Sequence, residues 1–346
     1  MLISAFITHK KSETFEDCQD RFSVNPDTKS IAVSDGLSQS IFQKIWANQL
    51  VHAYTDNVDW VPNVESVKEL APYWKKKAEE FIKSEEADGK NPWRARNNLA
   101  EGRSAGATIL GIRFHDESWT YDVLGDSCII LINNNRVEEI ISSESKESFD
   151  NYPDYYDSNP KIGGKGELKT GTRQWNAGET ILLVSDPFAD FLAKNKETDK
   201  EALLVDRILG INSHDEFDGL VDEWRKLGMH NDDSTLVIVK QDGSNDFRLV
   251  PNCVDDIMAL KEVCRMKPQV IPSDKTKSAE SASPETVFSH KLEDFGQWLS
   301  KFLQSKLFKS KLFANSRRRE KNARKEFINQ LVEEIDAKLK ELFIEK

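Results

Sequence analysis

Short apolar runs separated by polar turns fill the first 240 residues of the chain. The runs are four to eight residues long, and β-branched residues and leucine dominate them, which is typical of strands in a sheet. They comprise residues 2–8, 21–24, 30–34, 107–114, 119–125, 127–133, 179–185 and 234–240. We expect each of these segments to form a β-strand.

Longer connections between these runs have a helical period. Apolar residues recur there at intervals of three to four, as on the buried face of an amphipathic helix. The helical segments are residues 40–54, 64–83, 202–211 and 217–227. The turns between residues 107 and 133 are too short for a parallel crossover, so the strands there should be antiparallel. The pattern predicts an α/β (α+β) fold, a four-layer αββα sandwich of two mostly antiparallel sheets flanked by helices.

Residues 137–178 include a polar stretch with Gly, Pro, Tyr and Ser and little periodicity. A loop of this length inside a domain is usually either a lid or disordered. A flap on the substrate side of the domain and a featureless surface insertion both agree with this composition.

The chain divides by composition into a folded body and a C-terminal extension. We expect a domain over residues 1–266, a linker rich in Lys, Ser, Pro and Thr over residues 267–286, and a helical extension over residues 287–346. Residues 291–346 carry 14 Lys and Arg against nine Asp and Glu, whereas the whole chain has a net charge of −11. The body is therefore acidic, which argues against nucleic acid as a partner of the whole surface.

The extension has two apolar stripes at helical spacing, which suit a helical hairpin or the groove of a partner. Residues 301–325 hold ten basic residues and one acidic residue, with phenylalanines between them. Such a segment can bind anionic lipid, nucleic acid or an acidic protein face. A solvated charged face accounts for the same pattern. We expect docking on the acidic body or on a protein partner ahead of binding to nucleic acid or a membrane surface.

Nothing in the sequence has the pattern of a membrane span or a secretory signal. No run approaches the roughly 20 apolar residues that a spanning helix needs, and the N-terminal segment becomes charged too early for a signal peptide. The cysteines Cys18, Cys128, Cys253 and Cys264 lack CxxC or zinc-type spacing. We therefore expect a cytoplasmic protein with reduced, mostly buried thiols.

Five aspartates stand at the ends of the apolar runs. Asp20 and Asp232 precede a run, Asp35 and Asp186 follow one, and Asp126 lies between two. Since the start of one antiparallel strand lies beside the end of its neighbour, all five can meet at one edge of the fold. A single aspartate in such a place is often only a turn former, but five together indicate a functional site.

A cluster of carboxylates without His or Cys partners is a hard-oxygen site, suited to Mg²⁺ or Mn²⁺ and poor for zinc. Several carboxylates can hold two such ions about 3.5 to 4 Å apart, and a water that bridges the ions becomes a nucleophile near neutral pH. Without cations, the acidic groups would repel one another and some would take up protons. The cluster therefore predicts hydrolysis of phosphate esters.

Short motifs, in order along the chain, carry a resemblance to a known family. They are CQD at Asp20, AVSDGLS at Asp35, SAGAT at residues 104–108, LGDSC at Asp126, VSDPFAD at Asp186 and DDST at Asp232. Through these motifs, about the first 240 residues resemble the PPM-type serine/threonine phosphatases (protein phosphatase type 2C). The start THKKSETFEDCQDRF, with His9 and Cys18, is similar to a bacterial branch that begins S/T-H…C-Q-D.

The resemblance implies a phosphatase that acts on phosphoserine and phosphothreonine in proteins with two Mn²⁺ or Mg²⁺ ions, and a third ion at a weaker site. The implied metal ligands are Asp20, the bridging Asp35, the carbonyl oxygen of Gly36, Asp186 and Asp232, with Asp126 at the third site. Asp20 and Asp35 would also be catalytic. His9 is either a proton donor near the phosphate or a structural residue.

Three departures from the family pattern reduce the number of groups expected to contact the substrate. Pro187 replaces the usual glycine of the SDG motif, Phe15 replaces a phosphate-binding arginine, and Leu37 stands where many members keep a histidine. The groups left to hold the phosphate are Lys10, Lys11, Arg21 and the metals themselves. Because the aspartates are intact, we expect an active enzyme. The alternative is a pseudophosphatase that works as a binding or regulatory module through its helical tail.

Overall fold

The computed structural model describes residues 1–143, 153–176, 178–243 and 246–250. The predicted domain boundary at residue 266, the linker and the helical extension lie outside these residues. The predictions about partners of the extension lie outside them too.

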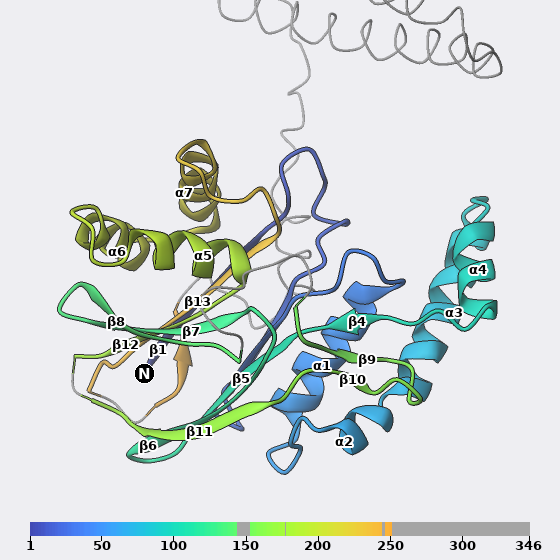
Figure 1. The fold of residues 1–346 in the computed structure, drawn as a ribbon, viewed down its shortest axis with the longest axis horizontal. Coiled ribbons are helices and arrows are strands. Elements are labelled where there is room, and N and C mark those ends of the chain that lie inside the picture. The colour runs from blue at the N-terminus through green and yellow to red at the C-terminus, as the bar shows by residue number, and fades with distance from the viewer. Residues whose placement is uncertain (144–152, 177, 244–245, 251–346) are drawn as a thin grey trace, which may run out of the picture. The chain divides into compact units, whose positions relative to one another are not determined.

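Two large sheets and one small sheet form the framework (Figure 1). The six-stranded sheet has the order β14 (Arg248–Leu249), β1 (Leu2–Thr8), β13 (Ser234–Lys240), β12 (Thr180–Val184), β7 (Cys128–Asn133), β8 (Arg136–Ile141). The five-stranded sheet has the order β11 (Lys169–Gln174), β6 (Ser118–Leu124), β5 (Ile109–Phe114), β3 (Ser30–Ser34), β2 (Arg21–Asn25). The small sheet has the order β10 (Gly164–Lys165), β9 (Tyr155–Asp157), β4 (Gly106–Ala107). Neighbouring strands are antiparallel except β1 and β14.

Helices cover the outer faces of the two large sheets (Figure 1). The helices on the side of the five-stranded sheet are α1 (Gln43–Asp56), α2 (Val64–Lys68), α3 (Ala71–Ala87) and α4 (Trp93–Ala100). The helices on the side of the six-stranded sheet are α5 (Asp186–Asn195), α6 (Glu201–Leu209) and α7 (His214–Lys226).

Three apolar cores separate the four layers. The central core joins the inner faces of the two large sheets, with Ile3 and Ile181 from one sheet and Val33 from the other fully buried. A second core packs α5, α6 and α7 on the six-stranded sheet around Trp224, and a third packs α1 and α3 on the five-stranded sheet around Trp46. The predicted αββα sandwich is therefore confirmed.

One predicted helix is divided in the structure. Residues 64–83 have a continuous helical period, but α2 ends at Lys68 and α3 begins at Ala71. Pro72 stands in the first turn of α3. Because proline lacks a backbone N–H and clashes with the preceding turn, it starts a helix well and interrupts one that is already running.

The polar stretch after residue 137 contributes ordered strands. β9 and β10 form the small sheet together with β4, and β11 forms an edge of the five-stranded sheet. β9 and β10 escape prediction because they have only two or three residues, and β11 escapes it because its polar sequence KTGTRQ has no apolar alternation.

None of the helices in the described part of the chain combines the length and the apolar character needed to cross a membrane.

A missing side chain on β5 makes room for the aromatic ring of Tyr54 on α1. Tyr54 is fully buried, and its hydroxyl donates a hydrogen bond to Asp122 Oδ2 at 3.0 Å. A Cβ atom added at Gly111 would lie 2.3 Å from Cζ of Tyr54. The glycine thus allows α1 to pack closely on the sheet.

We expect Gly111→Ala to lower the free energy of unfolding by about 1 to 3 kcal/mol, because the packed core cannot accept the extra methyl group without strain. Urea denaturation of the purified variant measures this loss. Gly219→Ala is the matched control, since Gly219 is in α7 with no atom near its added Cβ, and there alanine should stabilise by up to about 1 kcal/mol. Equal stability of the two variants would contradict the packing argument.

Candidate functional site

Strand register brings two of the predicted aspartates together on the five-stranded sheet. Arg21 of β2 pairs with Ser34 of β3. Asp20 directly precedes Arg21, and Asp35 directly follows Ser34. The two aspartates therefore lie at the same end of this strand pair. Thr108 holds Asp35 in place, since the hydroxyl oxygen of Thr108 accepts a hydrogen bond from the backbone N–H of Asp35 at 2.9 Å.

The six-stranded sheet delivers the other three aspartates to the same region. Val184, at the end of β12, pairs with Cys128 at the start of β7 and with Leu236 of β13. Asp186 follows β12, Asp126 precedes β7, and Asp232 precedes β13. All three aspartates therefore lie at one end of this sheet, as the sequence predicts.

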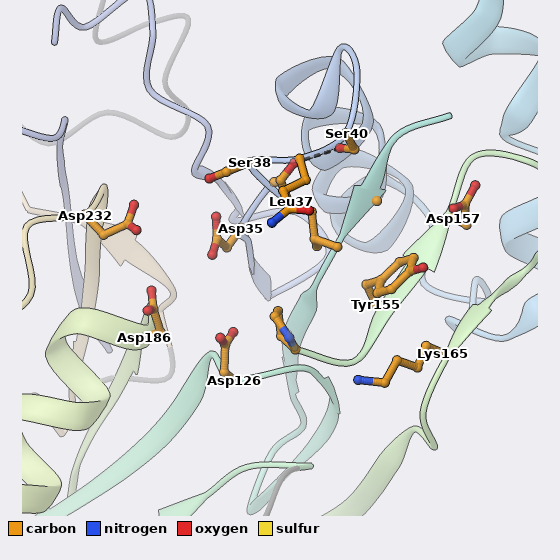
Figure 2. Close-up of a pocket in the computed structure, with 14 residues that line it drawn as sticks. Asp35, Leu37, Ser38, Ser40, Asp126, Tyr155, Asp157, Lys165, Asp186 and Asp232 are labelled. Atoms are coloured by element: carbon orange, nitrogen blue, oxygen red, sulfur yellow. Dashed lines mark hydrogen bonds between the residues drawn. The ribbon is translucent and has the colours of Figure 1, made fainter. Parts of the chain in front are cut away.

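A pocket of about 730 Å³ opens where the edges of the two sheets meet. Figure 2 shows the carboxylates of Asp35, Asp126, Asp186 and Asp232 facing a common space in this pocket. Gly36 also contributes to the lining. The structure thus brings together, around one cavity, most of the residues that the sequence singles out.

Asp20 lies behind the pocket wall and is 1% exposed. Its Oδ2 accepts a hydrogen bond from the hydroxyl of Thr235 at 2.7 Å. Its Oδ1 is buried and has no hydrogen-bond partner. A buried carboxylate oxygen without a donor is costly, so this atom is suited to a cation.

The pKa values of the clustered aspartates also indicate a site that is suited to a cation. Burial and the neighbouring carboxylates raise the pKa of Asp35 and Asp186 well above the usual range. Burial, together with the charges of Asp233 and Asp232, raises the pKa of Asp20 to about 7. Like charges that are forced together favour the protonated form unless a cation neutralises them.

Within the described residues, no three His, Cys, Asp or Glu side chains stand in a ready metal-binding geometry. The carboxylates nevertheless face one cavity, supply only oxygen donors and disfavour one another's charge. Hard divalent cations prefer such donors. The chemistry of these donors therefore fits a hard divalent cation such as Mg²⁺ or Mn²⁺.

The side chain of Lys10 forms an ion pair with this cluster of carboxylates. Its Nζ lies 2.9 Å from Oδ1 of Asp232 and 3.4 Å from Oγ of Ser38, which lines the pocket. Although burial opposes the charge of Lys10, the contact with Asp232 and the nearby carboxylates raise its pKa to about 12. Lys10 therefore remains charged at neutral pH.

The other two candidates for phosphate binding are placed differently. Arg21 is buried and donates hydrogen bonds through Nη1 to the carbonyl oxygens of Cys18 and Asp20, at 2.8 and 2.6 Å. Lys11 is exposed, and its backbone N–H donates to Asn231. None of the three candidates lines the pocket itself, and Lys10 differs from the other two by its contacts with the lining residues Asp232 and Ser38.

His9 directly follows β1 and does not line the pocket. Its Nδ1 lies 2.8 Å from the carbonyl oxygen of Lys10, and its own carbonyl oxygen accepts a hydrogen bond from Arg225. The backbone contact says nothing about the role of the ring, and the Nδ1 contact agrees with both alternatives for His9, a proton donor and a structural residue.

The departures at residues 15, 37 and 187 have clear places. Phe15 packs, partly buried, against the central core, and Leu37 lines the pocket. Pro187 is in the first turn of α5, directly after Asp186. The N–H groups of a first helical turn have no intrahelical acceptor, so proline costs no hydrogen bond there.

Sequence reasoning missed the side of the pocket formed by the small sheet. Tyr155, Asp157 and Lys165 line the cavity from β9 and β10, and Figure 2 shows the Lys165 amine pointing toward the carboxylates. The available signal was the polar stretch after residue 137, which has the length of a lid. Its place on the pocket favours a substrate-side flap over a featureless insertion.

The profile of the family described as protein phosphatase 2C matches residues 9–218. The chain therefore belongs to the protein phosphatase 2C family, and it is a PPM-type protein phosphatase. Among curated proteins, none matches the chain.

Several solved structures are similar to the chain. The photosystem II phosphatase PBCP is 17% identical, with 69% of this chain and 98% of that chain covered and a TM-score of 0.43. The serine/threonine phosphatase Stp1 from Staphylococcus aureus is 14% identical, with 69% and 95% covered and a TM-score of 0.46. The S. agalactiae serine/threonine phosphatase is 13% identical, with 69% and 99% covered and a TM-score of 0.45. Membership in the family rests on the profile match.

We expect Pro187→Gly to leave kcat/KM for a phosphate ester within about threefold of the parent value, because Pro187 occupies a helix position that needs no N–H donor. The free energy of unfolding should fall by about 1 kcal/mol, since glycine gains freedom in the unfolded chain. Steady-state kinetics and urea denaturation measure the two quantities. A tenfold rise in kcat/KM, absent from Pro187→Ala, would mean that glycine restores a geometry that proline distorts.

Proposed function

We propose that this phosphatase hydrolyses phosphoserine and phosphothreonine in proteins at a centre of two Mn²⁺ or Mg²⁺ ions, with a third ion more weakly held. The observation that carries the proposal is the convergence of Asp35, Asp126, Asp186 and Asp232 on one pocket (Figure 2), with the buried Asp20 close to Asp35. Asp20, Asp35, the Gly36 carbonyl oxygen, Asp186 and Asp232 would hold the ions, and Asp126 would hold the third.

Bound cations would polarise the phosphoryl oxygens and lower the pKa of the attacking water. The protein's own part is to hold the ligands. Asp35 is close to Asp20, Asp186 and Asp126, whose charges, together with burial, raise its pKa. This proximity supports a bridging role. Thr108 and Thr235 orient Asp35 and Asp20 through hydrogen bonds.

Lys10 is the group that we assign to the phosphate. It is charged, it reaches the rim of the pocket at Ser38, and Asp233 fixes its backbone by accepting a hydrogen bond from the Lys10 N–H at 2.9 Å. A charge-assisted hydrogen bond from an ammonium group to a phosphate oxygen adds affinity for the dianion. Lys10 would thereby take over from the arginine that Phe15 replaces.

The small sheet would contact the protein substrate beyond its phosphate. Tyr155 offers an aromatic face at the pocket, and the Lys165 side chain is half-exposed and directed inward. An extended peptide that enters the pocket would lie against this wall.

We expect Mn²⁺-dependent hydrolysis of p-nitrophenyl phosphate by the parent protein, and a loss of kcat by more than about 100-fold in Asp35→Asn, because a neutral amide cannot bridge two cations. The exposed Asp59→Asn is the control and should keep full activity, since Asp59 lies in a surface turn away from the pocket. Absence of turnover in the parent protein at saturating Mn²⁺, on phosphoserine peptides too, would contradict the enzyme proposal and leave the binding-module alternative.

We expect Lys10→Met to raise KM for a phosphothreonine peptide by about tenfold, because a hydrogen bond to a charged group contributes about 1.5 to 3 kcal/mol. Lys11→Met serves as the control, since that side chain is exposed and does not line the pocket. Steady-state kinetics with both variants at saturating Mn²⁺ measure the effect. An unchanged KM in Lys10→Met would remove Lys10 from phosphate binding.

A further inference from the structure

Two chain segments that carry proposed metal ligands lie side by side at the site. One is the loop over residues 9–20, which follows β1 and ends at Asp20, and the other is the turn over residues 231–233, which precedes β13. They are more than 200 residues apart in the sequence. Any contact that joins them sets the position of Asp20 relative to Asp232.

The carboxylate of Asp233 joins them from one side. Its Oδ1 accepts a hydrogen bond from the backbone N–H of Lys10 at 2.9 Å, and its Oδ2 accepts one from the backbone N–H of Gln19 at 2.6 Å. The residue is 2% exposed. Both oxygens are thus occupied by the two ends of the same loop.

The guanidinium of Arg225 joins the two segments from the other side. Its Nη2 donates to the carbonyl oxygen of His9 at 3.0 Å and to that of Asp232 at 2.8 Å. The Arg225 side chain is 9% exposed and comes from α7, which Trp224 anchors in the core beneath. The guanidinium is therefore held by a helix, α7, that is packed against the core.

Neither of these side chains lines the pocket. They touch the backbone of the segments and not the space where a substrate would sit. The two N–H donors that face residue 233 require a carboxylate, because each of them needs an acceptor oxygen. An asparagine has one acceptor oxygen and would turn an NH₂ group toward the second N–H donor.

We infer that Asp233 and Arg225 form a brace that holds Asp20 and Asp232 at the separation at which both bind metal. Groups that orient metal ligands without touching the metal contribute about 10- to 100-fold to metal affinity. This inference rests on the proposed function, because it takes Asp20 and Asp232 as ligands. It assigns positioning roles to two residues and no contact with the reacting atoms.

The test is Mn²⁺ binding to the metal-free full-length chain, measured by isothermal titration calorimetry for the parent protein, Asp233→Asn and Arg225→Lys. Lysine keeps the charge of Arg225 but lacks the planar fork that reaches two carbonyl oxygens. We expect each variant to bind Mn²⁺ about tenfold more weakly. Thermal unfolding in EDTA accompanies each titration, so that loss of fold and loss of affinity are separated.

The matched control is Arg207→Lys. Arg207 of α6 forms an exposed bidentate ion pair with Glu223 on α7, so its replacement disturbs the same helix without touching either segment. Weaker Mn²⁺ binding in both brace variants and parent-like binding in the control support the brace. Parent-like binding in both brace variants, or an equal loss in the control, overturns it.

The parent protein and Asp35→Asn are titrated alongside. If the parent protein binds no Mn²⁺, the proposed function fails, and the brace fails with it. If the parent binds Mn²⁺ and Asp35→Asn does not, while the brace variants bind as the parent does, only the brace fails. If a brace variant has no folding transition in EDTA, the other brace variant decides the outcome.

Discussion

Mutual repulsion among clustered carboxylates is the constraint on which the rest of this site depends. Bringing five aspartates to one place raises the pKa of Asp20, Asp35 and Asp186, because burial and like charges act together on these three. A flexible chain would relieve this cost by moving the aspartates apart. The two sheets prevent it, because each aspartate is attached to the end of a strand whose register is set by its neighbours.

The stiffness that this requires comes from the three apolar cores. Strands with nearly every residue buried, such as β3 and β12, have no register other than the one that fills the cores. Polar contacts then adjust the site locally. Thr235 and Thr108 form hydrogen bonds with Asp20 and Asp35, and Asp233 and Arg225 hold two distant segments together. The cores hold the strand ends in place, and these hydrogen bonds hold the side chains.

Features that depend on local patterns were predictable. The segments 2–8, 30–34 and 234–240 form the strands β1, β3 and β13 with the expected bounds, since short runs of buried β-branched residues have few alternatives. The division of residues 64–83 into α2 and α3 was missed because the apolar period continues across the break that Pro72 imposes. The small sheet was missed because its strands are only two or three residues long.

The candidate aspartates could be selected from the sequence alone, because a strand end is visible there as the boundary of an apolar run. A hard divalent cation was the expected partner, because all five candidate side chains are carboxylates. The convergence of those aspartates, the contact of Lys10 rather than Arg21 with lining residues of the pocket, and the place of β9 and β10 in its other wall become visible in the folded chain alone. These facts depend on contacts between residues far apart in the chain, such as Asp233 with Gln19, which no local pattern records.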